Sequence, residues 1–511
     1  MSRINTNVSS LIAQRVLGNN GSSLSSSLER LSTGLKISRG KDDPAGLIAS
    51  EALRAEGKGL NQALSNAERA DQVASIAEGG LQEISGLLTE LQGLVTQTAN
   101  TAGLSTAEKG ANQLQIDSIL QTIDRVSAAT SFQGIKLLNG NLDYTVTNVA
   151  TAVSSFKVNG AKLAFQGTRD VNIQVTRSAQ VGALLLSFGG GVINLNSTAA
   201  ASAGAKFVIE IAGTKGAREL SFTSGTSLAN VRDAVNTFKD VTGVSATVIG
   251  ASGIRLSSVE YGGDAFVSAK VTNAAGAVGS GILTYSATNN SVATPGSAVA
   301  FTAATNPVKD FGQNLSATIK VITATTRGKI AQINTDFLDV KVELTTTAAQ
   351  TLAATSPAFR ITGGGADFQL AGEVSIAGKV SLGISNVAVR ALGRQAVGSS
   401  VYYLSNLGSG RELNLVNGDV SEAQKVITNS ISEVSSLRGR LGAFQKNTVG
   451  ATIRSLGVSA ENTVAAESII RDADFASETS ALTRSQILVQ SATQILGIAN
   501  QQPQSVLQLL G

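Results

Sequence analysis

The chain has 511 residues, with 40 Lys and Arg against 36 Asp and Glu and a formal net charge of +4. This length predicts two to four domains, and so small a net charge is not typical of nucleic-acid or membrane-surface proteins. The sequence contains neither His nor Cys. Their absence excludes thiolate nucleophiles, Ser-His-Asp triads, Cys/His zinc sites and disulfide bonds, and any catalysis would have to rest on carboxylates, Lys or Tyr. We expect no catalytic residues, cofactor or metal ion.

The sequence shows neither the pattern of a cleaved signal peptide nor that of a membrane span. The first residues, MSRINTNVSSLIAQRVLG, contain no apolar run of the length that a cleaved signal peptide needs. No run of roughly 18 apolar residues follows anywhere, so we expect no membrane insertion. These features alone would assign the chain to the cytoplasm, an assignment that the family resemblance described below replaces.

Composition divides the chain into three zones. Residues 1–140 and 418–511 have helical patterns, whereas residues 141–417 are rich in Gly, Thr, Ser and Val and read as strands and turns. Helices at both ends and strands between them predict an α+β fold: paired N- and C-terminal helices with a large β-rich central insertion.

The N-terminal zone predicts three helices. A stripe of apolar residues spaced by three, four and seven positions runs from Ile4 to Leu35. Asp43 and Pro44 then form an N-cap and a first helical position for a long helix ending near Asn100. A third helix follows Ser105. The expected seam of the long helix is Val73, Ile76, Ile84, Leu87, Leu91 and Leu94, and that of the third is Ile116, Ile119, Ile123 and Val126.

The C-terminal zone predicts a second helical region. A turn at residues 417–419 precedes a heptad-like stripe made of Ile427, Val434, Leu437, Leu441 and Phe444. We expect a weak point near Gly457 and a further helix that ends at Pro503, because proline interrupts helical hydrogen bonding. An apolar tail, Val506–Leu510, follows. Isolated helices are marginal in water, so the stripes at the two ends require partners.

The middle zone contains one pattern that predicts a small unit. Strands are expected at residues 207–211, 220–222, 244–249 and 254–256, with a helix from 228 to 238 capped by Ser227. This gives a ββαββ unit at residues 206–267. A second β-rich unit is expected at residues 290–400, with turns at 363–365 and at Gly378.

Several segments of the sequence resemble bacterial flagellins. They include Arg3-Ile4-Asn5-Thr6-Asn7, LERLSTGLKISRGKDDPAGLIAS at 28–50, EGGLQEISGLLTELQGLVTQTAN at 78–100, IDRVSAATSFQGIKLLNG at 123–140 and the segment 469–510, which contains ANQQPQ. The unit at 206–267 is similar to the insert domain of many flagellins. The resemblance covers both ends of the chain, whereas the rest of the middle matches no flagellin pattern.

The resemblance implies a domain organisation. Residues 1–44 and 461–511 would form the coiled-coil inner tube of a filament, and residues 45–140 and 401–460 the surrounding helical shell, with a β-hairpin near 132–145. Residues 141–400 would be the variable outer region. The implied function is that of a non-enzymatic subunit that polymerises into the flagellar filament for swimming motility. The alternatives are a hook–filament junction protein, which shares flagellin-like ends, and a catalytic domain displayed in the insert, which the lack of His and Cys disfavours.

The resemblance also implies partners and a location. The chain would form a helical homopolymer and would contact an export chaperone, the filament cap and hook–filament junction proteins, with no nucleic-acid partner. It would be secreted through the flagellar type III channel to the extracellular flagellum, its N-terminal segment acting as an uncleaved signal. The expected polymerisation seam comprises Ile4, Val8, Leu11, Leu24, Leu28, Leu31, Leu35, Leu482, Leu488, Ile495, Ile498, Leu507 and Leu510.

A possible immune-receptor surface follows from the same resemblance. Flagellins detected by the vertebrate Toll-like receptor present an Arg, a Leu four residues later and a Gln-containing stretch on the second long helix, with a Glu on the next helix. Leu94 and Gln97 match this pattern, but Glu90 occupies the Arg position and Gln115 the Glu position. The pattern predicts weak or absent receptor activation.

Other motifs have plainer interpretations beside functional ones. The Gly runs at 189–191 and 363–365 lack the Lys-Ser/Thr of phosphate loops, which favours turns. The pairs Asp42-Asp43 and Asp472/Asp474 could be glycosidase-like, but capping is the favoured role at helix starts. The tail after Val506 lacks the basic residues of a membrane anchor. Ser/Thr-rich stretches at 197–202 and 345–355 fit either O-glycan acceptors or plain exposed loops.

Overall fold

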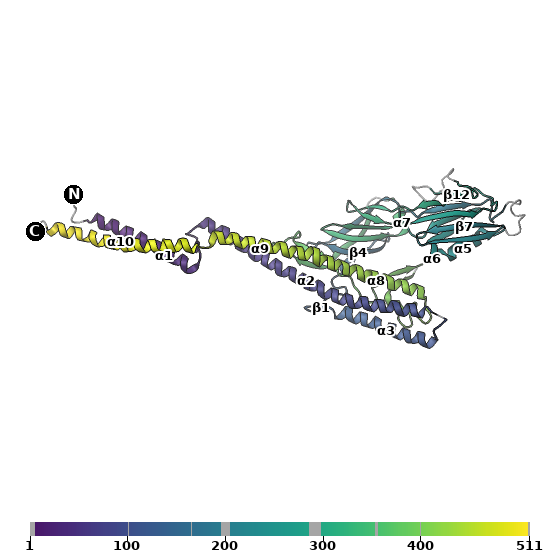
Figure 1. The fold of residues 1–511 in the computed structure, drawn as a ribbon, viewed down its shortest axis with the longest axis horizontal. Helices are drawn as coiled ribbons and strands as arrows, with labels where there is room; N and C mark the ends of the chain where they lie inside the picture. Colours follow the sequence, from purple (N-terminus) through teal and green to yellow (C-terminus); the bar gives the residue numbers. More distant parts are fainter. Residues whose placement is uncertain are drawn as a thin grey trace. The chain divides into compact units, whose positions relative to one another are not determined.

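The computed structural model describes residues 6–100, 102–164, 166–195, 205–285, 298–352, 356–398 and 400–508. The chain forms two compact units. The first contains Met1–Glu78, Phe368–Val380 and Arg438–Gly511, and the second contains Gly79–Asp367 and Ser381–Leu437. Long helices from both chain ends and a β-rich central region confirm the expected α+β fold (Figure 1).

The two terminal helices of the first unit lie side by side and antiparallel. Helix α1 is Val8–Thr33 and helix α10 is Phe475–Gln508. Contacts at both ends fix their direction, because Asn7 Nδ2 donates to the Ala499 carbonyl and Arg30 pairs with Glu478 at 2.9 Å. In Figure 1 they form the purple and yellow pair. The two chain ends are therefore partners of each other, as the sequence predicts.

The first unit also contains the start of a second long helix, α2 (Pro44–Thr98). Asp43 Oδ1 accepts a hydrogen bond from the Gly46 amide at 2.9 Å, which confirms the predicted cap with proline at the first helical position. Helix α9 (Gly450–Arg471) contacts it through Arg471, whose guanidinium lies 3.1 Å from Glu51. A π-helical segment, η2 (Phe444–Val449), precedes α9, and Gln445 Nε2 donates there to Ser75 Oγ at 2.8 Å.

Two predicted helix breaks are wrong. Helix α9 continues through Gly457, because one glycine costs a helix interior only about 1 kcal/mol. The break falls instead at Asp472–Asp474, where Asp474 Oδ1 accepts from the Ala476 amide and starts α10. Helix α10 also continues past Pro503 to Gln508. The carbonyl that this proline leaves without a helical donor belongs to Ala499, and it accepts from Asn7 instead.

The helical part of the second unit has one shared core. Helix α3 (Thr106–Ala129) begins with a capping box between Ser105 and Glu108, and helix α8 is Val420–Ala443. The buried residues of α2 repeat at alternating steps of three and four, which is a coiled-coil seam. Ile84 and Leu91 of the predicted seam belong to it and Val73 is also buried, whereas the other three predicted residues are not buried. Ile76 is 39% exposed and Leu87 and Leu94 are half-buried. The buried positions of α2 within this unit are Leu81, Ile84, Leu88, Leu91, Val95 and Thr98.

Irregular segments form hydrogen bonds with side chains of helix α3. The side chain of Gln113 on α3 donates to the Leu407 carbonyl at 2.9 Å and accepts from the Leu415 amide at 2.8 Å. Asp124 accepts from the Val389 amide at 2.9 Å. A short hairpin of β1 (Ser131–Phe132) and β2 (Ile135–Lys136) follows α3, in part of the range predicted for a hairpin.

The predicted ββαββ elements are all present, but they do not form a separate sheet system. Two four-stranded sheets, ordered β12-β6-β10-β9 and β13-β11-β7-β8, enclose a core with helix α5. Four of these strands, β6, β11, β12 and β13, lie partly or wholly outside residues 206–267. Both sheets are therefore completed by strands from the flanking sequence. The elements are β6 (Ala183–Ser187), β7 (Lys206–Gly213), β8 (Ala217–Thr223), α5 (Leu228–Thr237), α6 (Lys239–Thr242), β9 (Val244–Ile249), β10 (Gly253–Ser258), β11 (Phe266–Asn273), β12 (Gly281–Thr284) and β13 (Val308–Phe311).

A second pair of sheets completes the β-rich region. Their orders are β15-β14-β5-β19-β3 and β16-β17-β18-β4, so the strands expected within 290–400 pair with strands from residues 144–177. The elements are β3 (Tyr144–Thr147), β4 (Val153–Ala161), β5 (Arg169–Arg177), β14 (Ser316–Ile319), β15 (Ile322–Thr323), β16 (Thr325–Arg327), β17 (Ile330–Asn334), β18 (Leu338–Leu344), α7 (Thr346–Gln350) and β19 (Ser356–Gly364). Smaller hairpins are β20 (Ala366–Gln369) with β21 (Lys379–Leu382) and β22 (Gln395–Val397) with β23 (Ser400–Tyr402).

Candidate assembly interface of the terminal helices

The contact face between α1 and α10 is made of small residues. Its buried positions are Ser10, Ala13 and Ser27 on α1 and Ser485, Ala492 and Ala499 on α10. The three positions on α10 are seven residues apart, which is the repeat of a coiled coil. Small side chains at these positions allow the two backbones to approach closely, but each buries little apolar area.

Larger residues flank this line of small ones and are only half-buried. They occupy the intervening heptad positions, Leu17, Leu24 and Leu31 on α1 and Leu482, Val489 and Leu496 on α10. At the inner end, Leu35 follows α1 and forms a bridge with Asp472, while the Lys36 amide donates to the Arg471 carbonyl at 2.7 Å. The pair therefore has a continuous contact face with a thin core.

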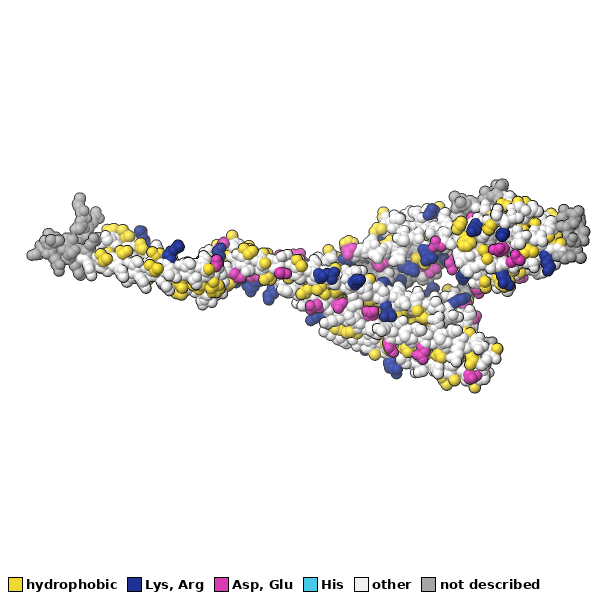
Figure 2. Space-filling view, in the orientation of Figure 1, with side chains coloured by type: hydrophobic (Ala, Val, Ile, Leu, Met, Phe, Trp, Pro, Cys, Tyr) yellow, Lys and Arg dark blue, Asp and Glu magenta, His cyan; other side chains and the backbone are white. Residues whose placement is uncertain are grey.

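A different set of large apolar residues points away from this contact. Leu11 is 55% exposed, Ile495 58% and Ile498 66%, values far above those of core residues. Figure 2 shows hydrophobic side chains along the surface of this pair. The exposed face of the terminal pair, which we call the outer apolar face, comprises Val8, Leu11, Ile12, Val16, Leu28, Ile487, Leu488, Ile495 and Ile498.

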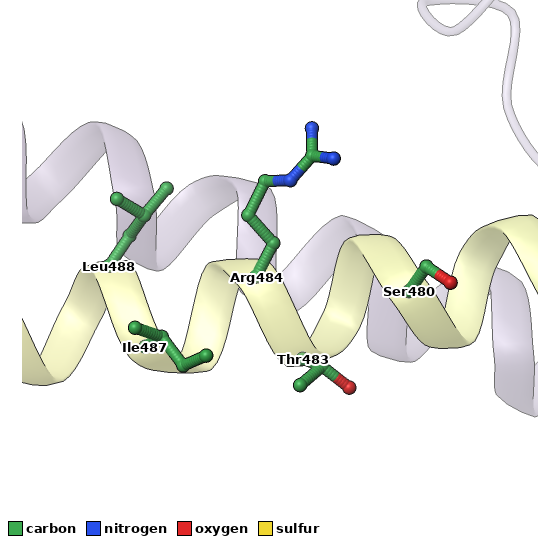
Figure 3. A pocket seen from close by; sticks show the side chains of 5 residues that line it. All are labelled: Ser480, Thr483, Arg484, Ile487 and Leu488. Carbon is green, nitrogen blue, oxygen red and sulfur yellow. The ribbon is translucent and has the colours of Figure 1, made fainter.

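The outer apolar face is hollowed in two places. A groove of about 230 Å³ lies between the helices and is lined by Ile12, Val16, Leu488 and Ile495 among others. A hollow of about 460 Å³ lies along α10 and is lined by Ser480, Thr483, Arg484, Ile487 and Leu488. Figure 3 shows Arg484 and Leu488 projecting to the same side of α10. The groove between the helices is lined mainly by apolar side chains and fits apolar partners, whereas the hollow along α10 also presents Ser480, Thr483 and Arg484.

The residues of the predicted seam separate into two sets. Leu24, Leu31, Leu35 and Leu482 are half-buried, and Val8, Leu11, Leu28, Leu488, Ile495 and Ile498 belong to the outer apolar face. Ile4 and Leu510 lie outside the described residues, and Leu507 lies in α10 in a stretch whose side chains are not described. The prediction missed the buried Ser and Ala residues, whose signal in the sequence is a seven-residue repeat of small side chains.

The acidic pairs serve local structure. Asp42 Oδ2 accepts from the amides of Ser38 and Arg39, and the Arg39 bond is the first cause of a lowered pKa for Asp42. Asp472 Oδ2 accepts from Ser468 Oγ at 2.6 Å, and Asp474 caps α10. These bonds assign both pairs to turns and caps, the role favoured over a glycosidase pair.

The remaining motifs lie on turns and exposed surfaces. Of the run predicted as a turn, Gly363 and Gly364 end strand β19 and only Gly365 lies in the bend before β20; Gly364 and Gly365 have φ angles of 83° and 82°, which L residues rarely adopt. Thr345 caps α7, whereas residues 197–202 and 353–355 lie outside the described residues. Among the residues that the structure describes, no helix is long and apolar enough to cross a membrane, and no cluster of three potential metal-binding side chains occurs.

The residues of the possible receptor surface lie on adjacent helices of the second unit. Glu90 and Gln97 on α2 and Gln115 on α3 are exposed, and Leu94 is half-buried. A buried hydrogen bond of 3.0 Å from Asn112 Nδ2 to Thr98 Oγ1 joins the two helices beside them. The four side chains are thus accessible from solvent to differing degrees.

Comparisons with known proteins identify the class. Residues 4–143 match the bacterial flagellin N-terminal helical region, residues 424–510 match the bacterial flagellin C-terminal helical region, and residues 206–260 match the flagellin hook IN motif. Together with the paired terminal helices, these matches define a structural protein of the bacterial flagellum. A flagellin of Salmonella typhimurium is 30% identical over 529 residues, covering 99% of each chain, and a B-type flagellin of Pseudomonas aeruginosa is 29% identical over 532 residues, covering 99% of each.

The chain belongs to the flagellin family. It is a structural, non-enzymatic protein, the subunit of the flagellar filament, which is a homopolymer. The alternative of a hook–filament junction protein has weaker support. The flagellar junction protein from Legionella pneumophila is 14% identical, with coverage of 84% of this chain and 99% of that one and a TM-score of 0.23.

Proposed function

We propose that the outer apolar face of α1 and α10 is the surface through which neighbouring subunits pack in the filament. The observation that supports it is the exposure of large side chains such as Leu11, Ile495 and Ile498 on the terminal pair. An apolar surface of this kind is favourably removed from water by contact with similar surfaces. In a homopolymer, the same face of other subunits is the available partner.

The difference in side-chain size between the two faces of the pair supports the same proposal. Small residues such as Ala13 and Ala492 hold the two helices of one subunit together. The larger side chains, which contribute about 1.5–3 kcal/mol each when fully buried, are kept for contacts outside the subunit. A pair built in this way gains most of its stability on assembly, as expected of a polymerisation seam.

The domain organisation belongs to the same proposal. Residues 1–44 and 461–511 form the inner tube, residues 45–140 and 401–460 the helical shell, and residues 141–400 the outer region with the 206–267 insert. The thin contact face of α1 and α10 supports the first assignment. The buried coiled-coil seam around Leu81, Leu88 and Val95 supports the second.

Export and partners complete the proposal. The chain leaves the cell through the flagellar type III channel and reaches the extracellular flagellum, with the N-terminal segment as its uncleaved signal. An export chaperone shields apolar terminal surface before assembly, and cap and junction proteins contact the ends of the filament. The exposed apolar residues of α10, including Ile487 and Ile498, support a need for such shielding.

The test of the assembly surface is a charge placed on the outer apolar face. The side chain of Leu488 is 45% exposed in the single subunit, so Leu488→Asp should leave secretion and monomer folding unchanged. In a filament it would bury a charge, which costs several kcal/mol per subunit in lost hydration even where Arg484, one turn away, pairs with it, and filaments should fail to form. The matched control is Val321→Asp, at a position 94% exposed in the β-rich region, which should assemble normally. Filaments of ordinary length from Leu488→Asp would overturn the proposal.

A second candidate role concerns the receptor surface of Glu90, Leu94, Gln97 and Gln115. The exposure of Glu90 and Gln115 supports their direct contact with a receptor that approaches these helices. A Glu at the position where detected flagellins carry Arg would repel a carboxylate that accepts from that Arg. We therefore infer weak activation of the vertebrate Toll-like receptor by this flagellin.

A further inference from the structure

One side chain at the outer end of the terminal pair bonds to both helices. Asn7 Oδ1 accepts from the Ser10 amide at 3.1 Å and so caps the N-terminus of α1. Asn7 Nδ2 donates to the carbonyl oxygen of Ala499 on α10 at 2.7 Å. An asparagine amide has both an acceptor and donors, so one side chain can make both bonds at once.

The acceptor on α10 is unusual within its helix. In an α-helix each carbonyl accepts from the amide four residues later, and the residue four positions after Ala499 is Pro503. Proline has no amide hydrogen, yet α10 continues to Gln508. Ala499 is only 7% exposed, so water has little access to the oxygen that the proline leaves free. Asn7 supplies the donor that the helix itself lacks.

Neighbouring bonds give a contrast. Ser10, which is 8% exposed, donates from Oγ to Asn500 Oδ1 at 2.7 Å, so two adjacent residues of α10 are bound at this end. Further along, Asn20 Nδ2 lies 3.4 Å from the Leu488 carbonyl. That carbonyl faces the amide of Ala492, its ordinary helical donor, so Asn20 adds a longer bond to an oxygen with a partner. Asn7 replaces a missing bond, whereas Asn20 supplements an existing one.

We propose that Asn7 and Pro503 form a clasp that fixes the axial register of α1 against α10. The buried small residues at 485, 492 and 499 are nearly alike, so their packing alone does not set the register, and polar contacts such as Asn7 to Ala499 at the outer end and Arg30 to Glu478 at the inner end have to set it. Pro503 is the one proline within α10, and it frees one carbonyl for Asn7 to bind. The clasp thereby aligns the residues of the outer apolar face, and this inference rests on the proposed role of that face.

Substitutions at Asn7 separate the clasp from the cap. Asn7→Ser keeps a good capping oxygen but is too short to reach Ala499, whereas Asn7→Ala loses both bonds. We expect both variants to raise the concentration of free subunits in equilibrium with filaments by about tenfold, which corresponds to about 1.4 kcal/mol. Asn19→Ala, at an exposed position of the same helix, is the matched control and should change it less than about twofold. A wild-type value for Asn7→Ser would overturn the clasp.

A double-mutant cycle tests the role of the proline. Pro503→Ala restores an amide that donates to Ala499 within α10, so Asn7→Ser should cost less than about threefold in that background. An equal loss in both backgrounds would overturn the coupling. The cycle also separates this inference from the assembly surface. If Asn7→Ser assembles like the wild type while Leu488→Asp does not, the clasp is wrong and the assembly surface stands; if Leu488→Asp assembles normally, the assembly surface is wrong.

Discussion

Gly59 on α2 and Gly372 in the loop between β20 and β21 touch through their backbones. A Cβ atom added to Gly59 would lie 2.8 Å from the Gly372 carbonyl oxygen, closer than such atoms approach in proteins. Two further contacts of the first unit hold the same loop. Asn66 Nδ2 donates to the Gln369 carbonyl at 3.2 Å, and the rings of Phe368 and Phe444 lie 5.8 Å apart. The tip of the β20–β21 hairpin, Phe368–Val380, therefore belongs to the first unit, together with the terminal helices.

This contact predicts opposite effects for two glycines on one helix. Gly59→Ala should lower the free energy of unfolding of the monomer by about 1–3 kcal/mol, because the new methyl group has to displace backbone. Gly79→Ala should raise it by about 0.5–1 kcal/mol, because nothing lies within 4 Å of its Cβ position and alanine favours helix. Urea denaturation of both variants measures the difference. The packing assignment would be wrong if both substitutions stabilised the monomer.

The thin contact face of the terminal pair predicts folding coupled to assembly. Arg15 on α1 and Arg484 on α10 are exposed, and in monomers trypsin should cut after them early because small buried residues stabilise the pair weakly. Arg125, an exposed residue of α3 in the well-packed helical core, is the internal control and should be cut late. In filaments all three sites should resist. Equal rates at Arg15 and Arg125 in monomers would contradict this prediction, as would fast cleavage of filaments at Arg484.

The strand pairing suggests where the outer region can be removed. Thr145 on β3 pairs with Gly363 on β19, so the chain enters and leaves the larger sheets at neighbouring positions. Deleting residues 146–362 and joining the ends by a short Gly/Ser linker should leave polymerisation intact, since paired strands lie only about 5 Å apart. Electron microscopy of the secreted protein measures the outcome. Loss of both export and assembly would show that the β-rich region belongs to the scaffold.

A longer deletion is the matched comparison for that experiment. Removing residues 146–400 also removes Phe368, and with it the contact to Phe444, and Val389, whose amide donates to Asp124. This variant should form a less stable monomer and fewer filaments than the shorter deletion. Equal assembly of the two variants would show that the β20–β21 hairpin contributes nothing to the helical units.

Large apolar residues and their spacing predicted the helices and the contact faces of α3 and α8, where Ile123 and Val434 are fully buried, but not those of α1, α10 and the first half of α2. The α2 seam continues in the first unit through five alanines, and the α1–α10 contact uses Ser and Ala. Such residues carry almost no hydropathy signal, so apolar spacing selects Ile76 and Ile495, which are exposed, and Leu87, which is half-buried. A heptad count that includes small residues would have found both faces. The buried alanines of α2 are Ala63, Ala67, Ala70, Ala74 and Ala77.

Tertiary contacts explain what the sequence could not predict. Pro503 carries a strong stop signal, and only the position of Asn7 across the pair reveals why the helix continues. The strands of the 206–267 unit were correctly predicted from alternation and from the Ser227 cap, but sheet order depends on pairing between distant segments. Local signals therefore predicted the elements, whereas long-range pairing decided their partners.

The receptor surface gives the last prediction, through the charge at Glu90. Replacing an interface Arg by Glu reverses a charge and removes a bidentate donor, which at a binding hot spot costs roughly 2–4 kcal/mol, on the order of 30- to 1000-fold in affinity. The exposed positions of Glu90 and Gln115 mean that Glu90→Arg with Gln115→Glu can restore this pattern without disturbing a core. We expect weak activation of a Toll-like receptor reporter by the wild type and a strong gain in the double variant.

The matched control for the receptor experiment is a charge change of the same kind elsewhere on α2. Glu83 is exposed on this helix, seven residues before Glu90, and Glu83→Arg adds the same positive charge outside the four-residue pattern. It should leave receptor activation unchanged, because a general increase in positive charge is screened over about 8–10 Å in physiological salt. Strong signalling by the wild type that the double variant does not alter would refute the prediction. Such a result would mean that Glu90 lies on a solvated face and that the rest of the surface binds without it.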